Sequence, residues 1–140
     1  MDTTTLTLTT EDGITVHVNR WLPPEGTTVR AVVQIAHGMA EHSQRYERFA
    51  QALTQVGFAV YAHDHRGHKM TAVTHDQSGY LADSGGWAHL VEDLGSVIAL
   101  AREEQPGLPI ILFGHSMGSF VSRAFAAERG NELAGLILSG

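Results

Sequence analysis

The feature that most constrains this chain is the pentapeptide Gly-His-Ser-Met-Gly at residues 114–118. It follows an apolar run at 109–113, which is typical of a buried strand, and it precedes apolar residues at helical spacing. A serine at such a strand–turn–helix junction forms a nucleophile elbow, which exposes the hydroxyl above a sheet. Gly114 and Gly118 fit this arrangement, because the turn is tight and the helix must pass close to neighbouring strands. The sequence therefore predicts a sharp turn that presents Ser116.

Strands and helices alternate along the rest of the chain. Two segments of period-two hydrophobicity around a Glu-Asp-Gly turn predict a β-hairpin over residues 6–21. Ser43 is expected to cap the first helix, and Gly57 to end it, where a left-handed residue is favoured. The order predicts βαβ crossovers and a mainly parallel sheet, with the hairpin as its antiparallel edge. The expected elements after the hairpin are strand 31–36, helix 43–56, strand 58–62, helix 87–101, strand 109–113, helix 120–127 and strand 134–138.

Composition restricts the class of protein. The chain has 140 residues, 43% hydrophobic and 17% charged, which suits one domain with a buried core. A net charge of −6 argues against nucleic acid or an anionic membrane surface as the main partner, and the lack of cysteine excludes disulfides and thiolate catalysis. The N-terminus lacks a signal-peptide pattern, and no apolar run approaches the ~20 residues of a membrane span. We therefore expect a cytoplasmic protein with at most peripheral membrane contact.

Two backbone N–H groups are expected to serve Ser116 as donors for an oxyanion. A serine hydroxyl is a weak nucleophile, so it needs a base and donors for the developing oxyanion. The Met117 N–H, at a helix N-terminus, is one expected donor. The Met39 N–H is the second, because Gly38 lets the backbone after His37 come close to the reacting centre. The alternative is that Ser116 is an ordinary helix cap and that the His-Gly pair is an ordinary turn.

Three motifs connect these residues to a known family. Residues 37–46 read HGMAEHSQRY, residues 64–68 read DHRGH, and residues 114–119 read GHSMGS. Together they resemble the monoacylglycerol lipase and lysophospholipase group of α/β-hydrolases, and its bacterial, serine aminopeptidase-like members most of all. The resemblance covers nearly the whole chain. It implies hydrolysis of the ester of a small lipid-like substrate through an acyl-enzyme on Ser116, without a cofactor, and an oxyanion hole at Met39 and Met117.

The chain departs from the family pattern at two points. Lys69 stands where the family usually has glycine, and a lysine there could strain the loop. No histidine and no aspartate follows Ser116, whereas the triad order in this fold is serine, acid, histidine. We therefore expect residues 1–140 to be the N-terminal portion of a single α/β-hydrolase domain, truncated after the sixth strand. The sheet edge left uncovered would favour self-association.

Two other function classes remain open. The chain could be a catalytically impaired fragment or pseudoenzyme that binds an acyl ligand or a partner. Residues 63–68, His-Asp-His-Arg-Gly-His, also resemble the His-x-His-x-Asp-His signature of zinc hydrolases, but glycine replaces the aspartate. His63 and His65 could converge on a metal ion, although Arg66 would repel it. We expect no metal, and a pair between Asp64 and Arg66 that holds this loop.

The remaining singled-out residues are expected to be structural. His115 supports the elbow, and it leaves the turn in a different direction from the serine. Histidines on upstream loops should fill those loops rather than replace the missing base. Trp87 should pack on the sheet, Tyr46 should fix the first helix against the oxyanion loop, and Glu104 should lie in solvent at a helix end.

Overall fold

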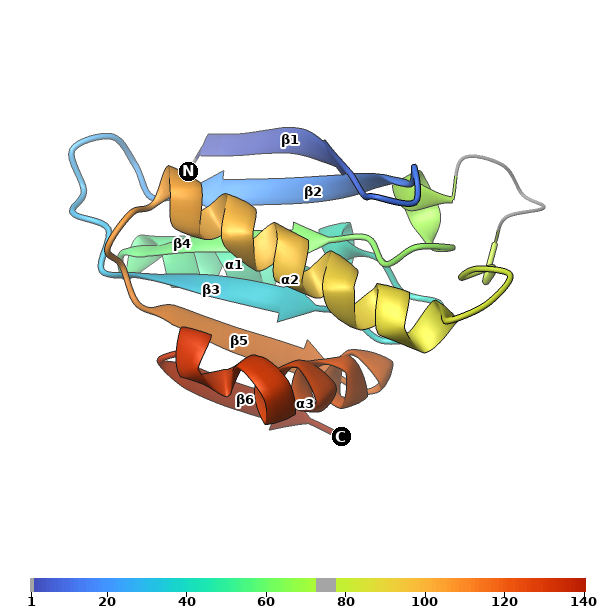
Figure 1. Cartoon of the computed structure of the whole chain (residues 1–140). Helices are drawn as coiled ribbons and strands as arrows, with labels where there is room; N and C mark the ends of the chain where they lie inside the picture. Colours follow the sequence, from blue (N-terminus) through green and yellow to red (C-terminus); the bar gives the residue numbers. More distant parts are fainter. Residues whose placement is uncertain (1, 73–77) are drawn as a thin grey trace.

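The computed structural model describes residues 2–72 and 78–140, in which one sheet separates helices on its two faces (Figure 1). The strands are β1 (Asp2–Thr9), β2 (Thr15–Leu22), β3 (Ala31–Ala36), β4 (Phe58–His63), β5 (Ile110–His115) and β6 (Gly135–Ser139). The α-helices are α1 (Glu47–Gln55), α2 (Gly86–Glu104) and α3 (Met117–Arg129), and the short 3-10 helices are η1 (Ser43–Tyr46), η2 (Lys69–Thr71) and η4 (Gly130–Glu132). Within the described ranges, no helix combines the length and apolarity that crossing a membrane requires.

The order of the six strands across the sheet is β1-β2-β4-β3-β5-β6. β1 pairs with β2 and β2 with β4 in antiparallel register, whereas β3 pairs with β4 and β5, and β5 with β6, in parallel register. Each parallel pair requires a crossover connection, which the helices supply. The predicted mainly parallel sheet with an antiparallel hairpin at its edge is confirmed.

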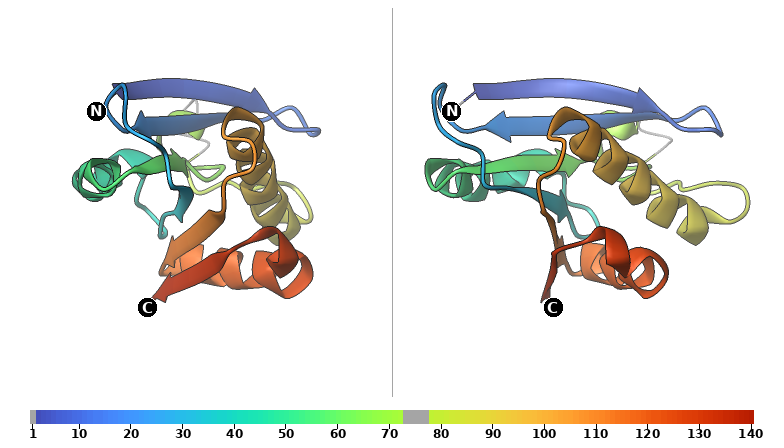
Figure 2. Two further views of the ribbon diagram at one scale, coloured as in Figure 1. Left: turned by 90° about the vertical axis from the view of Figure 1, so that its left-hand side faces the viewer. Right: turned by 60° about the vertical axis from the view of Figure 1, so that its left-hand side comes forward.

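β3 lies in the middle of the sheet and is buried on both faces. Val32 packs in the core beneath α2 and α3, while Val33 and Ile35 pack in a second core beneath α1. Figure 2 shows α1 on one side of the sheet and α2 and α3 on the other. A strand covered on both faces is expected to be a nearly continuous apolar run, and residues 31–36 are apolar except for Gln34, which is also buried. Its carboxyl end delivers the chain to the candidate site.

The first helix begins later than predicted. Residues 43–46 form η1, and α1 begins at Glu47. Ser43 makes no side-chain cap; its hydroxyl donates to Asp64 Oδ1 at 2.7 Å and accepts from Asn19 Nδ2 at 2.8 Å. The predicted cap was therefore wrong, because a buried carboxylate from a distant loop competes for the serine. Gly57, at a φ of +92°, ends the helix as predicted.

Arg66 is buried and joins the hairpin turn to α2. Its guanidinium donates twice to Asp93 (2.7 and 2.9 Å) and twice to Asp12 (2.7 and 3.0 Å). A buried cation needs such partners to offset its lost hydration. The expected pair of Asp64 with Arg66 was wrong, since Asp64 accepts instead from the backbone N–H and the hydroxyl of Ser43.

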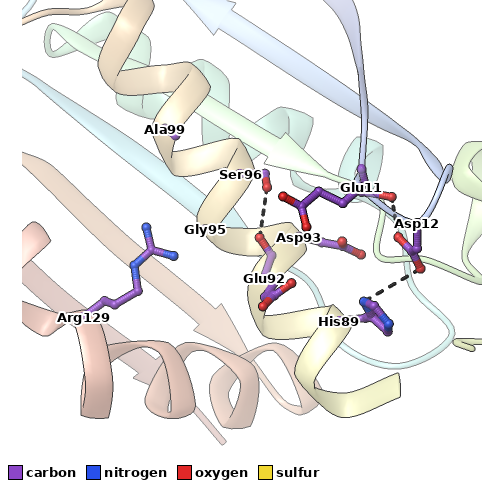
Figure 3. A pocket seen from close by; sticks show the side chains of 10 residues that line it. Glu11, Asp12, His89, Glu92, Asp93, Gly95, Ser96, Ala99 and Arg129 are labelled. Carbon is purple, nitrogen blue, oxygen red and sulfur yellow. Dashed lines mark hydrogen bonds and ion pairs between the residues drawn. The ribbon is translucent and has the colours of Figure 1, made fainter. Parts of the chain in front are cut away.

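A cavity of about 560 Å³ lies beside this ion pair (Figure 3). Asp12 lines it from the hairpin turn, His89 and Asp93 line it from α2, and Arg129 lines it from α3. None of the residues predicted for the site lines it. The cavity is therefore separate from the candidate active site.

Two helix residues lie in other surroundings than expected. Glu104 is not a solvated helix end: it accepts the Tyr61 hydroxyl at 2.6 Å and pairs with Arg20 at 3.1 Å. Trp87 is 47% exposed and lines a surface hollow with Phe120 and with Leu138 of β6, so it lies at the border of the sheet and not in its core.

β6 forms an open edge of the sheet. Leu136, Ile137 and Leu138 are all exposed on it, although parallel strands are ordinarily covered on both faces. Self-association through this edge stays a prediction.

Candidate active site

Ser116 occupies the junction between β5 and α3, where the orange strand of Figure 1 enters the red helix. Its backbone has a φ of +54° and a ψ of −119°, a conformation that residues other than glycine rarely adopt. Holding a serine there costs on the order of 1–3 kcal/mol, which the surrounding structure must offset. The Ser116 N–H donates to Ser139 O on β6 at 2.9 Å, and the serine itself is exposed. The predicted sharp turn is confirmed.

Two glycines allow α3 to reach this position. A Cβ atom on Gly118 would overlap the carbonyl oxygen of Ala36 and lie 2.5 Å from that of His37. A Cβ atom on Gly114 would lie 2.5 Å from the carbonyl oxygen of Gly118. The first turn of α3 therefore packs directly on the backbone at the ends of β3 and β5, as predicted from the two small residues.

The loop after β3 lies against the elbow. A Cβ atom on Gly38 would be 3.2 Å from Ser116 Cβ and 3.3 Å from His115 O, so the backbones of the two segments are in contact. Across residues 2–72 and 78–140, neither the Met39 N–H nor the Met117 N–H donates to a protein acceptor. Both expected oxyanion donors are thus free of partners in the described part of the chain, and they lie next in sequence to residues that meet at the elbow. Such free N–H groups beside a nucleophile can stabilise an oxyanion.

Glu41 organises this loop, which the sequence did not lead us to expect. Its Oε1 atom accepts the Gly38 N–H at 3.3 Å, and its carboxylate accepts the Tyr46 hydroxyl at 3.1 and 3.2 Å. Tyr46 therefore links η1 to the oxyanion loop, as predicted. Glu41 follows the His-Gly pair by only a few residues, so a search for a loop-capping carboxylate could have found it.

Buried histidines fill the space under the loop. Ring centroids of His37 and His65 lie 4.3 Å apart, and those of His63 and His65 lie 4.8 Å apart. The His37 Nδ1 atom faces Gly38 O at 2.6 Å, while its Nε2 atom accepts the His65 N–H at 3.0 Å. A carbonyl can only accept, so His37 must carry its proton on Nδ1.

Burial keeps these rings neutral. It lowers the pKa of His37 from the ordinary 6.5 to about 4 and that of His63 to about 3. Burial also lowers the pKa of His65 well below its usual range, and the neighbouring histidines add to the effect. If His37 were protonated, its Nε2 atom would also carry a hydrogen. That hydrogen would face the backbone N–H of His65, and two donors cannot form a hydrogen bond with each other.

We expect the stability of the chain to fall with acid because of these rings. Below about pH 6.5 the unfolded chain binds protons on them, whereas the folded chain does not until the pH approaches 4. The free energy of unfolding should therefore decrease from about pH 6.5 towards pH 4, by up to about 1.4 kcal/mol per pH unit for each ring. Urea unfolding at stepped pH measures this slope. His63→Asn should make this slope shallower, because one of the histidines that protonate in the unfolded chain is gone. An equal free energy of unfolding at pH 6.5 and at pH 4 would contradict the expectation.

The histidine cluster is not arranged as a metal site. In the part of the chain that the structure describes, no three His, Asp or Glu side chains are placed to hold one metal ion. His63 Nδ1 instead lies 3.3 Å from the amide nitrogen of Gln34, and His65 Nε2 lies 2.9 Å from His37 O. The geometry therefore gives the zinc alternative no support.

The other residues singled out near the elbow occupy defined places. His115 Nδ1 lies 2.9 Å from Ser139 Oγ, so its ring is engaged with β6. Lys69 has a φ of +40°, which confirms that the loop is strained at the position where glycine was expected. A surface hollow of about 440 Å³ lies between Met39 and Lys69. Residues 73–77 of the long loop after β4 lie outside the described residues.

Comparison with known proteins places the chain among hydrolases. Residues 27–140 match the model of the family described as Serine aminopeptidase, S33. The monoacylglycerol lipase of Mycolicibacterium smegmatis is 37% identical over 128 residues, which is 91% of this chain and 43% of that protein. Human monoglyceride lipase is 35% identical over 119 residues, 85% of this chain and 37% of its own length.

Solved structures agree with these relatives. A highly thermostable carboxyl esterase from Bacillus coagulans superposes with a TM-score of 0.89 at 36% identity, over 99% of this chain and 44% of that one. A protein described as a lipase in its open form gives a TM-score of 0.83, also at 36% identity, over 98% of this chain and 44% of that one. The chain thus spans less than half the length of each of these four proteins.

Proposed function

Because this chain belongs to the serine aminopeptidase S33 family and has the α/β-hydrolase fold, we propose that Ser116 is the nucleophile of a carboxylic ester hydrolase of the monoacylglycerol lipase type. Its relatives are named lipases and esterases. We further propose that residues 1–140 form the N-terminal portion of one such domain. The observation that carries the proposal is the strained, exposed Ser116 beside two free backbone donors.

The reaction would proceed through an acyl-enzyme. Ser116 Oγ attacks the ester carbonyl carbon while a base takes its proton, and the N–H groups of Met39 and Met117 stabilise the oxyanion. The C–O bond of the ester then breaks, and the alcohol leaves with a proton. Water hydrolyses the acyl group from Ser116 in a second, equivalent step. Residues 117–140 contain no histidine or aspartate, so the triad acid and base are proposed to come from outside this sequence.

Exposed methionines on the oxyanion loop and on η2 favour a lipid-like ester. Met39 is 70% exposed and lines the hollow beside the oxyanion loop, and Met70 is 59% exposed on η2. Exposed methionines adapt to flexible apolar ligands. The names of the lipase relatives point to the same class of substrate.

Covalent labelling tests this proposal on the chain as it is. A fluorophosphonate forms a stable adduct with an activated serine, and added imidazole can stand in for a missing base. We expect labelling at Ser116, located by peptide mass spectrometry, at a rate that rises with imidazole concentration. Denatured chain is the control for non-specific reaction. A folded chain that stays unlabelled at every imidazole concentration would favour the non-catalytic alternative, a fragment that binds an acyl ligand or a partner.

A further inference from the structure

We propose that His65 is a positioning residue for the oxyanion loop and that it acts through His37; this inference rests on the proposed role of Ser116. His65 belongs to the loop after β4 and His37 to the loop after β3, so the contact joins two crossover connections. Both side chains are fully buried.

His65 holds His37 from two sides. Its backbone N–H donates to His37 Nε2 at 3.0 Å, and its own Nε2 atom lies 2.9 Å from the carbonyl oxygen of His37. Because the carbonyl only accepts, His65 must carry its proton on Nε2. The two rings meet edge to face at 4.3 Å between centroids. The orientation of the His37 ring and the direction of its carbonyl are thus set by one neighbour.

Hydrogen bonds fix the orientation of the two peptide groups that flank Gly38. In the His37–Gly38 peptide, the His65 ring donates to the carbonyl oxygen, and Glu41 accepts from the N–H on the opposite side. In the Gly38–Met39 peptide, His37 Nδ1–H donates to the carbonyl oxygen at 2.6 Å. The C=O and N–H of a trans peptide point in opposite directions. The Met39 N–H is therefore aimed away from the His37 ring and left free for a ligand.

The loop depends on these hydrogen bonds because its own conformational preferences are weak or adverse. Gly38 has no side chain to restrict its peptides, and Ala40 has a φ of +60°. Without the His65 donor, the buried His37 carbonyl would have no hydrogen-bond partner among residues 2–72 and 78–140, which costs enough to drive a peptide to reorient. His65 donates to the His37 backbone, not to Ser116, so its effect on the reaction would be indirect.

Paired variants test the inference. His65→Phe keeps the ring and removes the donor, whereas His65→Gln retains an N–H donor near the Nε2 position. His63→Phe is the matched control, because His63 is equally buried and touches His65 but bonds to Gln34 rather than to the loop. We expect His65→Phe to slow imidazole-assisted labelling of Ser116 by about 10–100-fold, since a displacement of about 1 Å can cost about 100-fold and outright loss of an oxyanion donor costs about 100–1,000-fold. His65→Gln should recover most of the rate, and His63→Phe should stay within about threefold of wild type.

Nitrogen NMR of the histidine rings gives a readout that needs no variant and no activity. The geometry requires the Nδ1–H tautomer at His37 and the Nε2–H tautomer at His65 in the wild-type chain. The opposite tautomer at either residue overturns the inference even if His65→Phe fails to fold. A folded His65→Phe chain labelled at the wild-type rate, with an unshifted Met39 amide resonance, also overturns it.

If the wild-type chain is not labelled at all, the proposed function of Ser116 fails, and the NMR readouts still decide the role of His65. Both tautomers as required, with a Met39 amide shift that appears in His65→Phe and reverts in His65→Gln, would support the positioning role on their own.

Discussion

Replacing Ser116 with alanine is expected to abolish fluorophosphonate labelling at every imidazole concentration, a loss of at least about a thousandfold, because the nucleophile itself is removed. The alanine keeps the Cβ atom and the strained backbone, so the fold should be retained. Mass spectrometry of intact protein measures the labelled fraction, and circular dichroism checks that the variant is folded. Labelling that persists in this variant would place the reactive group elsewhere.

Ser116→Gly separates the chemistry from the backbone strain. This variant should also be unlabelled, but it should be more stable than Ser116→Ala, since glycine adopts a φ of +54° without a steric penalty. The strain is worth about 1–3 kcal/mol, and the extra freedom of glycine in the unfolded chain cancels about 1 kcal/mol of it. We therefore expect a net gain of about 1 kcal/mol over the alanine variant in urea unfolding. A glycine variant that is less stable than Ser116→Ala by about 1 kcal/mol would show that the elbow is not strained.

The second large effect is expected at Gly118. Gly118→Ala places a methyl group against the carbonyl oxygens of Ala36 and His37, which belong to the backbone and cannot rotate away. Either α3 shifts away from the end of β3 or the elbow opens. We expect a loss of about 3 kcal/mol or more in the free energy of unfolding, measured with urea. Labelling of any folded protein should also fall, because Met117 moves with the helix.

Gly130→Ala is the matched control for this substitution. Gly130 follows α3 at a φ of −61°, and the nearest atom to an added Cβ would be 3.9 Å away. Alanine restricts the unfolded chain here at no steric cost, so stability should stay unchanged or rise by up to about 1 kcal/mol. Similar losses at Gly118 and Gly130 would mean that glycine-to-alanine changes harm this helix in general, and that the close approach to β3 is not the cause.

The elbow could be recognised from the sequence because its determinants are local. Glycines at 114 and 118, an apolar run before them and a helical pattern after them are all carried by one short segment. The mainly parallel sheet and its antiparallel edge follow from the alternation of strands and helices after a short hairpin, which implies crossover connections. The same reasoning placed Met39 beside the elbow, since the ends of neighbouring parallel strands meet at one edge.

The errors concern side chains whose partners come from distant segments. Arg66 was expected to pair with Asp64, two positions away, but Asp12 and Asp93 reach it across the fold. Ser43 was expected to cap a helix, but Asp64 binds it from 21 positions away. Local patterns describe what a residue can bond with, whereas burial decides which of the available partners it must take.

By itself, then, the sequence determined the alternation of strands and helices, the sharp turn at Ser116 and the small residues that it needs, because backbone sterics and hydrophobic periodicity act over a few residues. Only the tertiary structure decided how the oxyanion loop is held. The His65–His37 contact and the Arg66 ion pairs each join segments that are brought together only when the sheet forms. Buried polar groups must find partners wherever the fold supplies them, and no local rule anticipates which those are.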